Sequence, residues 1–178
     1  MENTLGSVDF AGVGLLKQPL GLAFPWGRPV ERRVVAAVCY RRQANGKVEF
    51  LLVRTRAGRW TFPKGGVDGD PTPAVAAARE AHEEAGVHGR VEPLSFTRYL
   101  HYKNRSDAHT VNAHLCKVLH LETPRELYRS PRWFSAEKAK RRLRQARPTR
   151  YAQELERVVD QAVLCVSSYS EAAFSPFN

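Results

Sequence analysis

Residues 65–87 read GGVDGDPTPAVAAAREAHEEAGV, and this stretch decides the fold of the chain. Behind a glycine turn it places Glu80, Glu83 and Glu84 at spacings of three and four residues, which on a helix fall within about 100° of one another. Like charges at these spacings cost roughly a few tenths of a kcal/mol per pair. A hard divalent cation would neutralise them. The spacing therefore predicts a helix that carries a magnesium site.

The ends of this helix and its second face can also be predicted. Thr72 is a candidate N-cap with Pro73 at the first helical position, and Gly86 can form a left-handed turn at the C-terminus. The glutamates lie in the last two turns, where the helix dipole disfavours negative charge. Small side chains at spacings of three and four predict a face that packs closely on a sheet: Ala74, Ala78, Ala81 and Ala85.

The segment resembles the Nudix box. In that motif a glycine is followed by a glutamate six positions later, and then by Arg-Glu-apolar-any-Glu-Glu-any-Gly-apolar. The matching positions are Gly65, Arg79, Glu80, Ala81, Glu83, Glu84, Gly86 and Val87. The first glutamate of the family pattern falls on Pro71. In the family that glutamate mainly supports the box arginine, so the resemblance implies that Asp70 or Asp68 orients Arg79.

Length and composition fit one domain with extensions. A chain of 178 residues, 43% hydrophobic, can bury about 70% of its unfolded surface in a single core. No apolar run reaches the roughly 18 residues that cross a bilayer, and Met1-Glu2-Asn3 lacks the basic start of a signal peptide. We therefore expect a cytoplasmic protein without a membrane partner. Three cysteines far apart in sequence predict buried free thiols: Cys39, Cys116 and Cys165.

The order of elements predicts an α/β fold. Residues 1–31, rich in glycine and proline, are expected to form an irregular arm, residues 32–166 the folded domain, and residues 167–178 a C-terminal tail. Strands are predicted over 34–40, 48–55, 60–62, 94–102 and 110–121, with a last strand ending at 133–134; helices are predicted over 136–145 and 151–166. A mixed sheet between helices follows. The family resemblance specifies a Nudix-type α/β/α sandwich with a mixed β-sheet.

Looser motifs extend the resemblance over roughly residues 32–160. They are Leu51-Leu52-Val53-Arg54, Arg59-Trp60, Pro63, Gly65-Gly66, Arg132-Trp133-Phe134, and Arg147-Pro148 followed by Tyr151 and Leu155. Together they resemble the diphosphoinositol polyphosphate phosphohydrolase branch, whose members also tend to cleave diadenosine polyphosphates. The resemblance implies one of these two substrate classes. Nucleoside diphosphate sugars and capped RNA ends remain alternatives.

The charge balance favours an anionic, polyphosphorylated small molecule as substrate. The chain has 28 Lys and Arg against 18 Asp and Glu, a formal net charge of +10, which steers anions toward the protein. Arginine suits phosphate because its planar fork donates two parallel hydrogen bonds. The candidate substrate-binding residues are Arg54, Arg59, Lys64, Arg132 and Arg147; Arg56, Lys103, Arg105 and Arg129 are further candidates. For any single one, a solvated surface position is an equally good interpretation.

A denser basic cluster follows, comprising Lys138, Lys140, Arg141, Arg142, Arg144, Arg147 and Arg150. Such a run can bind a nucleic-acid backbone, but it also describes the wet face of an amphipathic helix. We favour the second interpretation, because residues 136–150 contain no aromatic side chain for stacking on bases. His82, His101 and His109 are candidates for substrate contact or proton transfer, although a lone histidine is more often exposed or hydrogen-bonded.

The resemblance implies metal-assisted hydrolysis of a phosphoanhydride. Mg2+, with Mn2+ as an alternative, would be held by Glu80, Glu83 and Glu84 and the carbonyl of Gly65, and would activate a water molecule. Glu80, Glu83, Glu84 and Arg79 form the expected catalytic set, with Arg79 bracing the glutamates. The predicted function is a divalent-metal-dependent pyrophosphohydrolase. The alternative is a non-catalytic module of the same fold that binds a nucleotide or RNA, and Pro71 is its main support.

Overall fold

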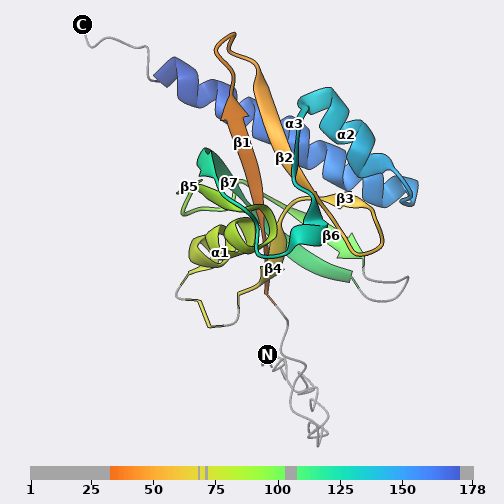
Figure 1. Ribbon diagram of the computed structural model, residues 1–178. Coiled ribbons are helices and arrows are strands. Elements are labelled where there is room, and N and C mark those ends of the chain that lie inside the picture. Colours follow the sequence, from red (N-terminus) through yellow and green to blue (C-terminus); the bar gives the residue numbers. More distant parts are fainter. Residues whose placement is uncertain (1–32, 68, 71, 103–107, 173–178) are drawn as a thin grey trace, which may run out of the picture. The chain divides into compact units, whose positions relative to one another are not determined.

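The computed structural model describes residues 33–67, 69–70, 72–102 and 108–172 (Figure 1). The strands in this part of the chain are β1 (Val34–Arg42), β2 (Val48–Arg54), β3 (Trp60–Thr61), β4 (Lys64–Gly66), β5 (Val87–Val91), β6 (Thr97–Tyr102), β7 (Ala108–Leu121) and β8 (Arg132–Ser135). The helices are α1 (Pro73–Ala85), α2 (Ala136–Arg144) and α3 (Thr149–Ala172), and a short 3-10 turn, η1, spans Leu127–Arg129. The predicted arm (1–31), Asp68, Pro71, Lys103, Arg105 and the end of the predicted tail lie outside the described residues.

The strands form a mixed sheet around β1. The order across the sheet is β3-β2-β1-β7-β5, with β4 paired to β1, β6 to β7 and β8 to β2. Strands β1 and β7 run parallel, with Val34 opposite Val111, whereas the other described pairs are antiparallel. A parallel pair requires a long crossover, and here α1 lies within it. The mixed sheet predicted from the sequence is confirmed.

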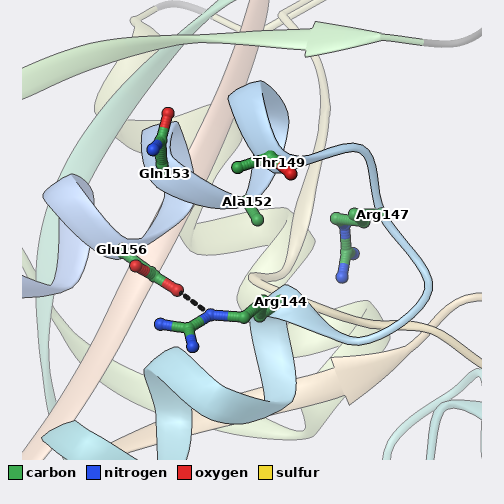
Figure 2. A pocket seen from close by; sticks show the side chains of 6 residues that line it. All are labelled: Arg144, Arg147, Thr149, Ala152, Gln153 and Glu156. Carbon is green, nitrogen blue, oxygen red and sulfur yellow. Dashed lines mark hydrogen bonds and ion pairs between the residues drawn. The ribbon is translucent and has the colours of Figure 1, made fainter.

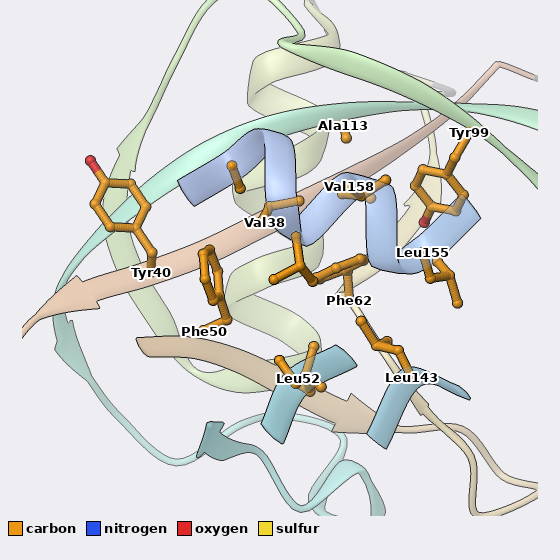
Figure 3. Packing of buried hydrophobic residues seen from close by; sticks show 14 of the residues in the cluster. Val38, Tyr40, Phe50, Leu52, Phe62, Tyr99, Ala113, Leu143, Leu155 and Val158 are labelled. Carbon is orange, nitrogen blue, oxygen red and sulfur yellow. The ribbon is translucent and has the colours of Figure 1, made fainter. Parts of the chain in front are cut away.

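Strand β1 is apolar from Val34 to Tyr40 because both faces of the sheet are covered there, whereas Arg41 and Arg42 at its end are exposed. Alternate residues face opposite sides of a strand: Ala37 and Cys39 pack with the α1 side of the core, and Val38 and Tyr40 with the side formed by α2 and α3. Figure 3 shows Val38 and Phe50 among the side chains of this second layer. Helices thus cover both faces, as the expected α/β/α sandwich requires.

Helix α1 begins and ends as predicted, but its alanine face is turned. The Thr72 hydroxyl accepts a hydrogen bond from the Val75 N–H at 3.2 Å, and Gly86 adopts a left-handed φ of 64°. Ala74 and Ala78 were expected against the sheet and are only half-buried. The buried residues are instead Ala76, Ala77, Glu80, Ala81, Glu84 and Ala85. The prediction was partly wrong because β4 covers the glutamate side of the helix.

Two strands were not predicted, and several boundaries differ. The sequence of β4 is only Lys-Gly-Gly, which has little β-propensity, and its pairing with β1 makes it a strand. Strand β5 contains Gly89 beside a register shift. Strand β6 begins at 97 rather than 94, since Pro93 and the exposed Leu94 precede it. Helix α3 continues to 172, beyond the expected end at 166.

The cysteines are free thiols, as predicted. Cys39 and Cys116 are far apart in the sequence but lie opposite each other on β1 and β7, and both are buried. Cys165 on α3 is half-buried, so the expectation of burial was wrong for this residue. In the described part of the chain, no helix combines the length and apolar character needed to cross a membrane.

The core between the sheet and α3 provides a test of stability. Leu155 on α3 is fully buried, and Leu155→Ala is expected to lower the free energy of unfolding by about 2–5 kcal/mol because a cavity is left behind. Leu164→Ala on the same helix is the matched control, because Leu164 is 70% exposed and should change stability by less than about 0.5 kcal/mol. Urea unfolding monitored by circular dichroism measures both. Equal losses in the two variants would contradict this packing.

Candidate active site

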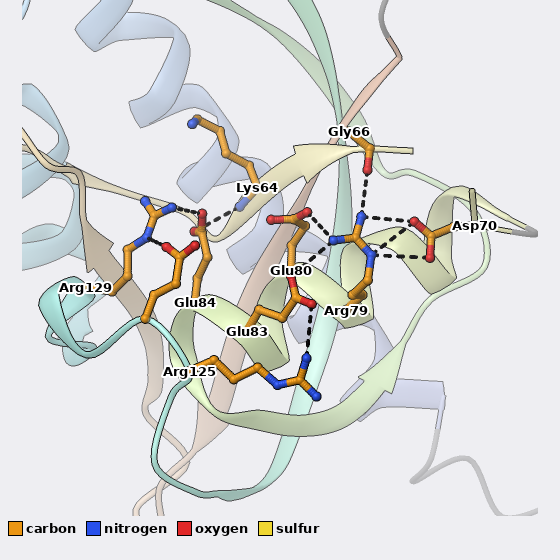
Figure 4. Close-up of polar contacts among 10 residues, drawn as sticks. Lys64, Gly66, Asp70, Arg79, Glu80, Glu83, Glu84, Arg125 and Arg129 are labelled. Atoms are coloured by element: carbon orange, nitrogen blue, oxygen red, sulfur yellow. Dashed lines mark hydrogen bonds and ion pairs between the residues drawn. The ribbon is translucent and has the colours of Figure 1, made fainter. Parts of the chain in front are cut away.

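Strand β4 lies across the carboxylate face of α1 (Figure 4). The Glu80 carboxylate occupies the space beside Gly65: a Cβ added to Gly65 would lie 2.1 Å from Glu80 Oε1. The backbone N–H of Lys64 donates to Glu84 Oε2 at 3.3 Å. Glycine at position 65 is therefore required by the close approach of a catalytic candidate, which agrees with its place in the motif.

Arg79 is the centre of the charge network on α1. Its guanidinium donates to Glu80 Oε1 at 2.8 Å, to Glu83 Oε2 at 3.2 Å and to the Gly66 carbonyl at 2.9 Å. The same group reaches Asp70, with Nη2 to Oδ2 at 3.0 Å and Nε to Oδ2 at 3.2 Å. Asp70 thus occupies the supporting position that Pro71 leaves vacant in the sequence pattern. Its hydrogen bond is the first cause of a raised Arg79 pKa.

Glu84 is the most buried of the three glutamates. Its side chain is only 4% exposed and forms an ion pair with Arg129. Burial raises the pKa of Glu84 to about 7, although Arg129 and Lys64 oppose this shift. Burial likewise raises the pKa of Glu80, opposed by Arg79. Buried carboxylates are costly as anions, so the protein supports them with cations from several elements.

Arg129 has a place that the sequence did not predict. It was a further candidate for substrate contact, but besides Glu84 it donates from Nε to Glu126 Oε2 at 2.6 Å. The N–H of Glu126 in turn donates to the carbonyl of Glu83 at 3.1 Å, and Arg125 Nη1 lies 3.5 Å from Glu83 Oε1. The segment before β8 therefore closes the site from the side opposite β4. In the sequence, only the positive charge of Arg129 indicated a role for this segment.

The described residues suit a divalent cation. Glu80, Glu83 and Glu84 offer hard oxygen ligands from one helix face, as Mg2+ requires. Two of them are buried with pKa values raised by desolvation, and a nearby divalent cation opposes such a shift. Glu83 is the most accessible, with a side chain 30% exposed. The donor set therefore fits the predicted ion, with Arg79 and Asp70 as the supporting groups.

A second cluster gathers basic and polar groups near Lys64. Burial lowers the pKa of Lys64, and Glu84 and Glu80 raise it while Arg129 and Arg147 lower it, so the ammonium lies between acidic and basic groups. In Figure 4 the Lys64 side chain extends from β4 away from the glutamates. Burial, followed by Lys64 and Arg147, lowers the pKa of His101 to about 4. His101 is therefore neutral at pH 7.

His101 contacts Tyr151, a residue of the looser family motifs to which the sequence analysis assigned no role. Its Nδ1 lies 2.5 Å from the Tyr151 hydroxyl, and Tyr151 also lies 5.4 Å beneath the guanidinium of Arg147. Arg59 further disfavours protonation of His101, which places it nearby. The structure thus brings the candidates Lys64, Arg59, Arg147 and His101 together and adds Tyr151.

Arg147 also has a structural task. It donates to the carbonyl of Leu143 at 2.5 Å and to the carbonyl of Trp60, and so ties the end of α2 to β3. It borders a hollow of about 240 Å³ between α2 and α3 (Figure 2). Across this hollow Arg144 donates to Glu156 at 2.6 Å. The role of Arg147 in substrate binding stays a prediction.

Arg54 and Arg132 lie beside aromatic residues. The Arg54 guanidinium stacks 4.7 Å over the ring of Trp60. Arg132 lines a groove of about 530 Å³ along β8 and α2, together with Trp133, Phe134, Lys138, Arg141, Arg142 and Gln145. Their role in substrate binding stays a prediction.

The basic residues of the run that begins at Lys138 have two kinds of neighbour, acidic side chains and aromatic rings. Lys140 pairs with Glu137 and Asp160, and Arg144 with Glu156, as expected for a solvated helix face. Arg142, in contrast, lies 5.9 Å over the ring of Phe134. The sequence argument found no aromatic residue within 136–150, but β8 brings two aromatic residues beside this run.

The remaining histidine candidates are separated. His82 pairs with Glu122 at 2.5 Å, on the side of α1 near β5. His109 stands opposite His101 on β7 and also disfavours its protonation. His82 is therefore not part of the second cluster, whereas His101 and His109 are close to it.

Comparison with known proteins identifies the family of the chain. The NUDIX domain model matches residues 31–155. The chain is 28% identical over 131 residues to rat diphosphoinositol polyphosphate phosphohydrolase 2, covering 71% of this chain and 70% of the relative. It is also 28% identical to the human enzyme 3-alpha, covering 71% of this chain and 77% of that enzyme.

Solved structures share the fold. A C. elegans Ap4A hydrolase in a binary complex superposes with a TM-score of 0.55 at 23% identity, covering 77% of this chain and 98% of the other. The NUDIX domain of Shewanella oneidensis NrtR, complexed with ADP ribose, gives a TM-score of 0.61 at 15% identity, covering 80% and 92%. The chain thus belongs to the Nudix family, and the prediction of a hydrolase that acts on phosphorus-containing acid anhydrides is confirmed at the level of that family.

Proposed function

We propose that the chain is a divalent-metal-dependent pyrophosphohydrolase that cleaves a phosphoanhydride bond in a highly anionic small molecule. The observation that carries this proposal is the pairing of two opposite clusters: Glu80, Glu83 and Glu84 on α1, and a basic cluster around Lys64. Acidic groups alone would repel a polyphosphate. The adjacent basic groups supply the attraction, and Lys64 belongs to both clusters electrostatically.

Each group has a distinct task in this proposal. Glu80, Glu83 and Glu84 would hold Mg2+ or Mn2+, which supplies positive charge to the phosphates and acidifies water. Arg79, held by Asp70, keeps Glu80 and Glu83 in place. A carboxylate of the cluster accepts the proton of the attacking water, since a base must lie within hydrogen-bond reach. Lys64 and Arg59 stabilise the charge of the remaining phosphates.

Diphosphoinositol polyphosphates and diadenosine polyphosphates are the favoured substrates. The named relatives at 28% identity support the first class, and the net charge of +10 suits ligands with many phosphates. A panel of phosphoanhydrides, incubated with the protein and Mg2+ and analysed by mass spectrometry, tests the choice. Turnover of a nucleoside diphosphate sugar or a capped RNA with neither favoured class cleaved would overturn it.

A non-catalytic module is the alternative from a different class. Its main support was the missing glutamate at Pro71, and the contact of Asp70 with Arg79 removes that support. Intact glutamates also repel one another without a cation. Tight binding of the panel compounds without any product, weakening steeply as salt rises, would favour the module over the enzyme.

Lys64→Met tests the proposed basic half of the site. Methionine keeps most of the length of the side chain and the backbone N–H that donates to Glu84, but removes the ammonium. We expect KM to rise by about 10- to 100-fold, since a charged hydrogen bond contributes roughly 1.5–3 kcal/mol. Lys47→Met in the exposed β1–β2 turn is the matched control and should leave KM unchanged. An equal KM in the two variants would remove Lys64 from the substrate site.

A further inference from the structure

A second group of potential metal ligands lies on the other side of α1. His82 is near the end of α1, His88 is in β5, and Glu122 directly follows β7. Each offers one ligand atom, and these atoms lie within 4.8 Å of one another. His82 Nε2 is 2.5 Å from Glu122 Oε1, and His88 Nε2 is 2.9 Å from Glu122 Oε2. The two imidazoles therefore converge on one carboxylate.

The backbone holds these three residues together. Gly86, between the two histidines, has a left-handed φ of 64°, and its N–H donates to the carbonyl of His82 at 2.8 Å. The N–H of Glu122 donates to the carbonyl of Gly86, also at 2.8 Å. A Cβ on Gly86 would lie 2.0 Å from the Glu122 carbonyl oxygen. The corner of α1, β5 and β7 is thus preorganised before any ligand binds.

The cluster contains a buried polar atom without a hydrogen bond of normal geometry. His88 Nε2 is buried and makes no hydrogen bond of normal geometry with any described residue, although Glu122 lies beside it. The ring of His120 stacks on His88 with centroids 4.4 Å apart and planes at 7°, which fixes the orientation of His88. Side-chain exposures of 29%, 39% and 48% for His82, His88 and Glu122 leave the group open to ions in solution.

We propose that His82, His88 and Glu122 form a site for a divalent transition-metal ion of the Zn2+ class, separate from the carboxylate site for Mg2+. Two neutral imidazoles and one carboxylate suit Zn2+, which binds them at about 2.0–2.2 Å and leaves a fourth position for water. Mg2+ prefers oxygen ligands, so the two sites select different ions.

The ligand atoms lie within 4.8 Å of one another and must shift to reach this geometry. Ligand atoms around a tetrahedral Zn2+ stand about 3.3 Å apart, slightly more than the observed 2.5 Å and 2.9 Å. Glu122 can supply the movement because its side chain is 48% exposed. An imidazole nitrogen that binds a metal ion carries no proton, so the site requires neutral histidines. The ion would link the end of α1 to the sheet.

Zinc titration of the tag-free full chain tests the site. With Mg2+ at saturation and nothing else added, calorimetry should show binding of one Zn2+ per chain. The spectrum of the protein with Co2+ in place of Zn2+ should show a tetrahedral ion. Thermal unfolding should shift upward with Zn2+, because the ion binds the folded state.

Variants assign the ligands. His88→Gln and Glu122→Gln should each weaken Zn2+ binding by more than about tenfold, since even residues around the ligands contribute about 10- to 100-fold to affinity. Glu137→Gln is the matched control, because Glu137 is a 72% exposed carboxylate on α2, which packs on the other face of the sheet. Its affinity should equal that of the parent. Circular dichroism without metal verifies that each variant folds.

Three outcomes would overturn the proposal. One is the absence of Zn2+ binding in the presence of Mg2+. Another is unchanged affinity in both His88→Gln and Glu122→Gln. The third is loss of Zn2+ binding in Glu80→Gln, which would assign the ion to the carboxylate site instead. None of these readouts depends on turnover, so the result is independent of the proposed hydrolase activity.

Discussion

Replacing Glu83 by glutamine is expected to lower kcat by about 10²- to 10⁴-fold at saturating Mg2+, the range for loss of a group that acts in proton transfer or holds the catalytic ion. Glu83 has the most exposed carboxylate of the α1 cluster, and it also takes hydrogen bonds from Arg79 and Arg125. Glutamine preserves shape and an oxygen acceptor but removes the charge. Product formation is measured by mass spectrometry on the substrate identified by the panel.

The same variant separates catalysis from folding. Without metal, Glu83→Gln should unfold at nearly the same temperature as the parent, because the relief of repulsion from Glu80 offsets the weaker contacts with Arg79 and Arg125. The upward shift of unfolding temperature that Mg2+ gives the parent should shrink, since the shift reflects affinity for the folded state. Glu137→Gln on α2 is the control, with a side chain 72% exposed. Full activity in both Glu83→Gln and Glu84→Gln would overturn the site.

The carboxylate cluster was predictable because helix periodicity alone fixes which residues of α1 lie together. The caps at Thr72 and Gly86 were predictable for the same local reason, since each depends on backbone groups within a few residues. The rotation of α1 was not. The alanines define one stripe, but Glu80 and Glu84 turn toward β4, and burial of their carboxylates depends on partners distant in the sequence.

Those partners mark the limit of sequence reasoning here. Glu84 contacts the N–H of Lys64 and the guanidinium of Arg129, which lie 20 and 45 residues away from it in the sequence. In the sequence, Arg129 does not differ from the other basic residues, and its contact with Glu84 depends on the position of the turn η1. His88 and Glu122 likewise carried no local signal, because their meeting with His82 depends on the pairing of β5 with β7.

Asp70→Ala is expected to weaken Mg2+ binding by about 10- to 100-fold, the usual cost of removing a group that orients metal ligands. Asp70 accepts from both Nε and Nη2 of Arg79, and its side chain is only 12% exposed. Without it, the guanidinium keeps Glu80, Glu83 and the Gly66 carbonyl but loses the contacts that fix its plane. The glutamates then remain charged but are held less rigidly.

Asp70→Glu and Asp160→Ala complete this experiment. Asp70→Glu keeps a carboxylate that can reach Arg79 and should recover most of the Mg2+ affinity, which a merely structural loss at this turn would not allow. Asp160→Ala removes another aspartate that forms an ion pair, here between α3 and Lys140 on α2. The Mg2+ affinity of this variant should match that of the parent. Calorimetric titration with Mg2+ compares all three. If Asp70→Ala binds Mg2+ as tightly as Asp160→Ala, then Asp70 does not replace the family's glutamate, and the orientation of Glu80 and Glu83 depends on the Gly66 carbonyl and Arg125 instead.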